Sequence, residues 1–140
     1  MSRALFAAST AILLALAAPA SAETLKMKAT LDGASEVPPN TTSGKGNADV
    51  TFDTASKKLS WKVTYSGLTG PATAAHFHGP AEPGKNAGVV VPIGNIATSP
   101  AEGSATLTDA QEADLVGGKY YVNVHTAANP GGEIRGQVTK

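Results

Sequence analysis

After residue 22, this sequence consists largely of short runs in which apolar and polar residues alternate, separated by glycines and prolines. All 15 glycines and eight of the nine prolines lie in this region. Every second residue is apolar from Leu25 to Leu31, and the stretch from Leu59 to Tyr65 repeats the pattern. A period of two is typical of strands with one buried face, and glycine and proline are typical of the turns between strands. The region is therefore predicted to be all-β.

The strand pattern occurs eight times. It lies at residues 25–31, 48–52, 59–65, 72–78, about 88–93, 103–108, 119–126 and 133–139. Residues 54–57 are predicted to form a hairpin turn, and residues 33–46 a long ordered loop. About seven or eight short strands in one domain of this length favour a Greek-key β-sandwich or a flattened barrel.

One segment departs from the strand pattern. Thr108 precedes an acidic stretch at residues 109–116, and Gly117-Gly118 follows it. A threonine at the N-cap, acidic residues in the first turn and glycines at the end are typical of a helix. We therefore predict one short helix near residues 109–116.

The first 22 residues differ in composition from the rest. Ser2-Arg3 is a short basic start, residues 4–18 are apolar, and Ala20-Ser21-Ala22 is a site of small residues. This pattern predicts a secretory signal peptide at residues 1–22, cleaved after Ala22, and one periplasmic or secreted domain at residues 23–140. The alternative is a transmembrane anchor, but the apolar stretch is short for about 30 Å of hydrocarbon and no second one follows.

Charge and composition argue against several classes of function. The sequence has 11 Lys and Arg against 11 Asp and Glu, so it lacks the basic excess that a nucleic-acid partner requires. It has no cysteine, and therefore no disulfide and no lipid-attachment site. It also lacks the Gly-x-Ser-x-Gly motif of serine hydrolases, a phosphate-binding glycine loop and a carboxylate pair suited to sugar hydrolysis.

The three histidines of the sequence lie in two of the predicted strands. His76 and His78 flank Phe77, so their side chains share a face, with Cβ atoms about 6.5–7 Å apart. His125 follows Val124, which belongs to the apolar face, and so points outward as well. If these strands are neighbours, cross-strand Cβ distances of about 5 Å bring the third imidazole to the first two. We predict that His76, His78 and His125 converge as ligands of one metal ion.

Other polar residues share the outward faces of these strands. Tyr121 and Asn123 are interpreted as neighbours of the ligands or as solvent-facing residues. Arg135 is interpreted as a group that positions a small anion, or as a surface or ion-pairing residue. Glu133 is placed to orient a ligand histidine, or to form an exposed ion pair with Arg135 or a lysine. Glu36, in a proline-rich loop, is interpreted as structural.

The ligand set predicts the type of metal. Three neutral imidazoles without a thiolate disfavour a closed structural zinc site and leave at least one position open. Affinity at nitrogen sites peaks at copper, so copper is the favoured metal and zinc the alternative. An open copper position near Arg135 permits chemistry on a small anion such as superoxide, or copper sequestration alone. A lone outward histidine is usually only a solvated side chain, so the prediction depends on all three converging.

Four blocks of the sequence resemble the CHRD (chordin) domain family. They run from Leu31 to Pro39, from Ala75 to Ala81, from Tyr120 to Thr126 and from Gly131 to Val138, in the order that the family has them. The resemblance covers about residues 25–139. It implies a compact β-fold and a secreted bacterial protein, without a settled biochemical activity.

The order of histidines also resembles the copper site of copper–zinc superoxide dismutase. There a His-x-His strand pair and a later histidine bind copper, and an arginine near the C-terminus guides the anion. The matching residues are His76, His78, His125 and Arg135. Residues 79–107 contain no histidine, cysteine or aspartate, so the zinc ligands and the bridging histidine have no counterpart, and the disulfide has none either. The resemblance therefore implies a copper-only site.

Two functions remain open on the sequence. The first is an exported copper-binding protein, with or without superoxide-related redox activity, in which binding is favoured over catalysis. The second is a non-catalytic interaction module outside the cytoplasm, as chordin repeats are in animals. Such a module would bind an unidentified protein through the loops at 33–46 or 79–102. Neither function involves nucleic acid or, after cleavage of the leader, a membrane span.

Overall fold

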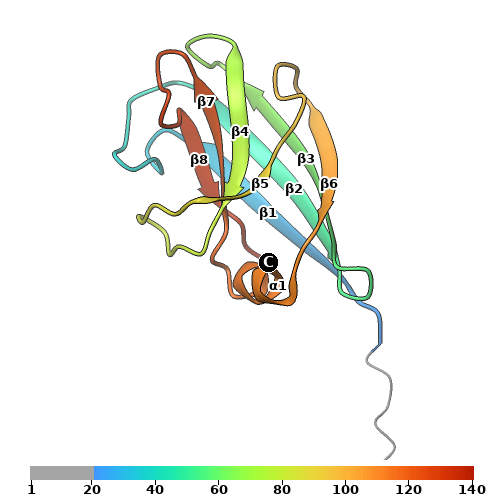
Figure 1. Ribbon diagram of the computed structural model, residues 1–140. Coiled ribbons are helices and arrows are strands. Elements are labelled where there is room, and N and C mark those ends of the chain that lie inside the picture. Colours follow the sequence, from blue (N-terminus) through green and yellow to red (C-terminus); the bar gives the residue numbers. More distant parts are fainter. Residues whose placement is uncertain (1–20) are drawn as a thin grey trace, which may run out of the picture.

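A computed structural model describes residues 21–140 and confirms the all-β prediction (Figure 1). Its elements are β1 (Thr24–Asp32), β2 (Lys45–Asp53), β3 (Lys58–Ser66), β4 (Ala72–His78), β5 (Val89–Pro92), β6 (Ala101–Thr106), α1 (Asp109–Val116), β7 (Tyr121–Thr126) and β8 (Ile134–Gln137). The signal peptide predicted at residues 1–22 lies outside the described residues, except for Ser21 and Ala22.

The eight strands of the described chain form one antiparallel sheet that curls into a nearly closed barrel (Figure 1). Its order is β5-β4-β7-β8-β1-β2-β3-β6, so β5 and β6 are the two edges. Long hairpins join β1 to β2 and β2 to β3, with continuous pairing along both. The connections from β3 to β4 and from β5 to β6 each run from one end of the sheet to the other. Of the two architectures that the sequence left open, the structure is the barrel-like one.

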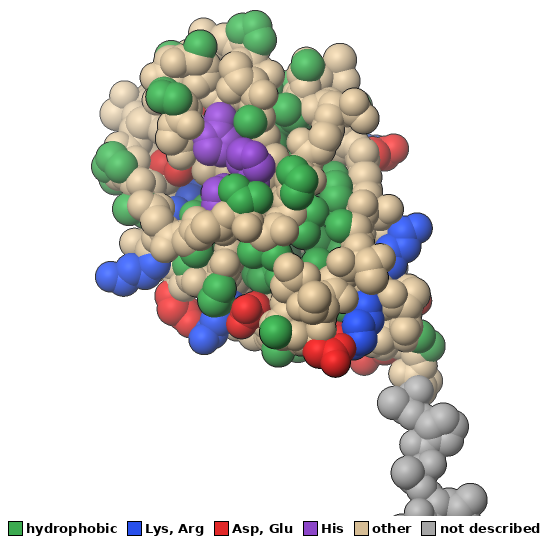
Figure 2. Space-filling view, viewed as in Figure 1, with side chains coloured by type: hydrophobic (Ala, Val, Ile, Leu, Met, Phe, Trp, Pro, Cys, Tyr) green, Lys and Arg blue, Asp and Glu red, His purple; other side chains and the backbone are tan. Residues whose placement is uncertain are grey.

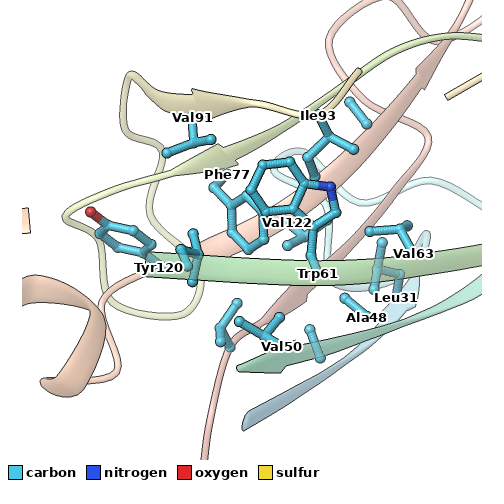
Figure 3. Packing of buried hydrophobic residues seen from close by; sticks show 14 of the residues in the cluster. Leu31, Ala48, Val50, Trp61, Val63, Phe77, Val91, Ile93, Tyr120 and Val122 are labelled. Atoms are coloured by element: carbon cyan, nitrogen blue, oxygen red, sulfur yellow. The ribbon is translucent and has the colours of Figure 1, made fainter. Parts of the chain in front are cut away.

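The apolar face of each strand lines the interior of the barrel. Trp61 of β3 and Phe77 of β4 meet there edge to face, with ring centroids 5.3 Å apart (Figure 3). Such pairs add about 0.5–1.5 kcal/mol to the burial of their area. Phe77 is fully buried, and because strand side chains alternate, its position directs His76 and His78 to the outer face. The other largest fully buried apolar side chains are Tyr120, Phe52, Leu31, Leu59, Leu115 and Ile134.

Strand β2 begins earlier than the sequence indicated. The loop predicted at 33–46 ends at Gly44, because β2 starts at Lys45 and includes Gly46. A Cβ on Gly46 would lie 2.8 Å from the carbonyl oxygen of Thr64 on β3. Glycine at this position marks the close approach of a neighbouring strand and not a loop.

Helix α1 confirms the prediction for residues 109–116. The Thr108 hydroxyl accepts the N–H of Gln111, and the Gln111 side chain accepts the N–H of Thr108, which completes a capping box. The strand predicted at 103–108 therefore ends earlier than expected. Thr108 is the N-cap of α1, and β6 ends at Thr106. In the part of the chain that the structure describes, no helix has the length and apolarity that crossing a membrane requires.

Candidate metal site

Strands β4 and β7 are neighbours, and their pairing brings the three histidines together. The ring centroids are 5.0 Å apart for His76 and His125, 5.4 Å for His76 and His78, and 6.4 Å for His78 and His125. The three rings gather on one face of the molecule (Figure 2). One ring nitrogen from each histidine lies within 4.8 Å of the others, a cluster that is able to hold a metal ion. The predicted convergence is confirmed.

Backbone carbonyls fix the proton positions on two of the rings. Nδ1 of His78 lies 2.9 Å from the carbonyl oxygen of Ala87, and Nδ1 of His125 lies 2.9 Å from that of Pro130. Because a carbonyl oxygen only accepts, each Nδ1 carries a proton and donates it. In the neutral rings, both Nε2 atoms therefore hold a lone pair. Histidines that bind metals commonly have the other ring nitrogen oriented in this way.

Burial favours the neutral form of the rings. It is the main cause that lowers the pKa of His76 and of His78, and the charges of His125 and His78 add to the effect at His76. Metal ions compete with protons for ring nitrogens. A lowered pKa therefore leaves these nitrogens available for a metal at neutral pH.

Asn123 lies beside the clustered histidine nitrogens and is 3% exposed. Its Oδ1 is 3.0 Å from Nε2 of His78 and 2.9 Å from Nε2 of His125. Nδ1 of His76 is 3.2 Å from the same nitrogen of His125. Oδ1 of Asn123 and the two Nε2 atoms carry lone pairs that face one another, and a cation between them stabilises this arrangement. Together with the nearby Nδ1 of His76, these atoms form a donor set suited to a divalent metal ion. The structure therefore places Asn123 next to the candidate ligands and not in solvent, which is the first of its two predicted positions.

Tyr121 and Arg135 support His78 from the side. The Tyr121 ring is stacked on His78, with centroids 4.8 Å apart and planes inclined by 2°, and the guanidinium carbon of Arg135 is 3.4 Å from the Tyr121 centroid. Arg135 is 2% exposed and donates to Oδ1 of Asn86 and to the carbonyl oxygen of Lys85. The interpretation of Arg135 as a surface residue is therefore wrong, because the loop between β4 and β5 covers it. Its role in positioning an anion stays a prediction.

Glu36 is a buried carboxyl next to the same cluster. It is 5% exposed, and its Oε1 has no hydrogen-bond partner among the described residues. Burial raises the pKa of this carboxyl to about 7, although the charge of Arg135 and the side chain of Asn123 oppose the rise. Sequence reasoning interpreted Glu36 as structural and missed its contact with the site. The loop that carries it has no periodicity from which a side-chain direction could be predicted.

We expect Glu36→Gln to stabilise the metal-free protein at pH 8 by about 1–3 kcal/mol and to have little effect near pH 4. The pKa of Glu36 in the folded state, about 7, lies above its ordinary value of 4.5. The carboxyl therefore destabilises the fold progressively as the pH rises from about 4.5 to 7, and costs nothing below that window.

Urea unfolding at both pH values, with a chelator present, measures the effect. Glu102→Gln, at an exposed position of β6, is the control and should change the free energy of unfolding at neither pH. A Glu36→Gln protein as stable as the parent at pH 8 would contradict the expectation.

Glu133 has partners that the sequence did not indicate. Its fully buried carboxylate accepts hydrogen bonds from the hydroxyls of Thr42, Thr69 and Thr126 and from the N–H of Thr69. Burial alone would raise the pKa of this carboxyl, but the hydrogen bonds outweigh burial and lower the pKa to about 2. Within the described chain it binds threonines, so both predicted roles, orienting a histidine and forming an exposed ion pair, are wrong. Glu133 instead ties two loops to β7.

Comparison with known protein families matches residues 27–138 to the CHRD domain. The match includes all three histidines, Asn123 and Arg135. No curated protein and no solved structure matches the chain significantly. The resemblance to the copper site of superoxide dismutase stays a prediction. Because the match spans most of the sequence, the chain belongs to the CHRD domain family.

Proposed function

We propose that this chain is an exported metal-binding protein that holds copper through His76, His78 and His125. The observation that carries the proposal is the convergence of one nitrogen from each ring within 4.8 Å. Backbone carbonyls hold the proton-bearing nitrogens of two rings, so the fold orients their free nitrogens toward the cluster. Such preorganisation lowers the cost of binding.

Copper fits this ligand set better than zinc does. The sequence has no cysteine, and nitrogen ligands bind divalent copper more tightly than divalent zinc. His76 and His125 are half-buried, so an ion held between them stays within reach of water and small ligands. A cavity of about 370 Å³, lined by residues 72–76 and 92–97, borders His76. Zinc is the alternative metal.

Redox chemistry on a small anion such as superoxide is the second part of the proposal. Copper, when bound, would supply the one-electron chemistry. Arg135 would contribute positive charge near the metal. Burial and the charge of His125 lower the pKa of His78, and the charge of Arg135 lowers it further, so Arg135 acts electrostatically on a proposed ligand. Because its guanidinium is already bound to Asn86 and Lys85, we propose binding as the main function and catalysis as an addition to it.

Titration of Cu(II) into the purified protein tests the proposal. We expect one ion per chain, an EPR spectrum with nitrogen couplings, and a rise in the thermal midpoint that a chelator reverses. The sequence has three histidines and all belong to this cluster, so every imidazole coupling reports on the site.

Parallel experiments separate the alternatives. Titration with Zn(II) decides between the two metals, and superoxide decay with the copper-loaded protein tests catalysis. A protein that binds neither ion, and whose stability is independent of chelators, would overturn the proposal. That result would favour the non-catalytic interaction module.

Export is proposed from the leader pattern at residues 1–22. N-terminal sequencing of the protein recovered from the periplasm or the medium should begin at Glu23. Recovery of the intact chain from the cytoplasm alone would overturn export without affecting the metal site.

A further inference from the structure

We infer that Asn123 is a fourth ligand of the same metal ion, bound through Oδ1, and that Glu36 holds the amide in the orientation that this bond requires. The inference rests on the proposed metal-binding function and adds an oxygen to its three nitrogens. Glu36 is a positioning residue in this arrangement, because it acts through Asn123.

The distances around Asn123 are those between neighbouring ligands of one ion. Two atoms that each lie about 2.0–2.1 Å from an ion are about 2.9 Å apart at a right angle and about 3.4 Å apart at a tetrahedral angle. Oδ1 lies 3.0 Å from Nε2 of His78 and 2.9 Å from Nε2 of His125. The distance from Nδ1 of His76 to Nε2 of His125 is 3.2 Å. All three contacts therefore have the length of a coordination edge.

Hydrogen bonding between neutral groups does not account for the contacts of Oδ1. The Nδ1 protons of His78 and His125 are donated to Ala87 and Pro130, so neither Nε2 has a proton to give. An amide oxygen also only accepts. Acceptors at this distance repel one another, and a shared cation converts the repulsion into attraction.

Glu36 faces the nitrogen end of the same amide. A Cβ placed on Gly132 would lie 2.3 Å from Oε1 of Glu36 and 2.8 Å from Nδ2 of Asn123, so both atoms border one small space. Gly132 has a φ of 129°, which favours glycine and leaves this space free of a side chain. A carboxyl group keeps an accepting oxygen in either protonation state, and an amide nitrogen only donates. With Oε1 of Glu36 on one side of this space, the amide is better placed with Nδ2 toward Glu36 and Oδ1 toward the histidines.

An oxygen ligand affects which oxidation state of copper the site prefers. Oxygen ligands suit harder ions, whereas soft ligands select Cu(I). Loss of Oδ1 is therefore expected to weaken Cu(II) binding more than Cu(I) binding. For this one-electron couple, each tenfold loss confined to Cu(II) raises the reduction potential by about 59 mV.

The test uses Cu(II) alone and Cu(I) alone as probes of the purified protein and its Asn123 variants. Asn123→Leu keeps the size of the side chain and removes the oxygen. We expect it to lower Cu(II) affinity at least tenfold, to change Cu(I) affinity less than threefold, and to alter the Cu(II) hyperfine coupling in EPR. Asn123→Asp keeps an oxygen and should bind Cu(II) at least as tightly as the parent. Asn47→Leu, at an exposed position of β2, is the matched control and should change nothing.

Variants of Glu36 test the positioning role. Glu36→Leu removes the acceptor and should shift the EPR spectrum toward that of Asn123→Leu. Glu36→Gln keeps an accepting oxygen and should restore the spectrum of the parent. A purely structural role would affect stability in these variants without changing the copper spectrum.

The results separate the inference from the function on which it rests. Equal losses of Cu(II) and Cu(I) affinity in a folded Asn123→Leu protein, or no loss of either, would overturn the inference and leave the three-histidine site intact. A parent protein that binds no copper would instead overturn the proposed function. If circular dichroism shows that Asn123→Leu does not fold, the inference is tested with the two Glu36 variants instead. Identical EPR spectra for Glu36→Leu and the parent would then overturn it.

Discussion

Replacing His76 with alanine is expected to lower the affinity for Cu(II) at least about a hundredfold, or by about 3 kcal/mol of binding free energy. Loss of a residue that only orients a metal ligand commonly costs about 10–100-fold. His76 would contribute a metal bond itself, since its Nδ1 lies 3.2 Å from Nε2 of His125. Two imidazoles would remain, and they hold the ion less tightly than three.

Competition with a chelator of known Cu(II) affinity measures this loss, and EPR should show one nitrogen coupling fewer. The fold should persist, because His76 is half-buried and points away from the apolar interior. Thr73→Ala, at an exposed position of the same strand, is the control and should bind copper like the parent. Equal affinities for the parent and for His76→Ala would refute the three-histidine site.

Replacing Glu133 with alanine is expected to lower the free energy of unfolding by about 3–5 kcal/mol and the thermal midpoint by about 10 °C or more. The carboxylate accepts four hydrogen bonds, three of them from threonine hydroxyls and one from a backbone N–H. Bonds to a charged acceptor are worth about 1.5–3 kcal/mol each, and alanine would also leave the buried hydroxyl of Thr126 without this acceptor. The loops that contain Thr42 and Thr69 would lose their anchor to β7.

The pH dependence identifies the charge as the cause. The pKa of Glu133 in the folded state, about 2, lies below its ordinary value of 4.5. The carboxylate therefore stabilises the fold above about pH 4.5, and this stability is lost as the pH falls toward 2. Urea unfolding of the parent and of Glu133→Ala should converge over that window, while Glu102→Ala should match the parent throughout. A difference that stays constant with pH would show that the charge is not responsible.

The directions of the histidine side chains could be predicted because alternation along a strand is a local property. Phe77 and Val124 are apolar and lie in the barrel interior, so their neighbours His76, His78 and His125 point outward. The order of the strands is not local: His76 and His125 are separated by 49 positions, and the sequence predicted their contact only on the condition that the two strands pair. The structure meets that condition through the pairing of β4 and β7.

The surroundings of the histidines could not be predicted, because loops supply them. Arg135 is buried by Lys85 and Asn86, and Glu133 finds its partners in two other loops. Loop conformations have no period from which side-chain directions follow. The sequence therefore indicated outward faces correctly and solvent exposure incorrectly, and it gave no signal for the contact between Glu36 and Asn123.

Strand β4 joins the histidine cluster to the barrel interior through one residue. Phe77, between His76 and His78, contacts Trp61, which is the one tryptophan of the sequence. If a metal ion bound by His76 and His78 shifts β4, the shift would reach the indole through Phe77, and the emission of Trp61 would then report occupancy without an added dye. A substitution that repacks the indole would in turn be expected to alter the affinity for an ion that the indole does not touch.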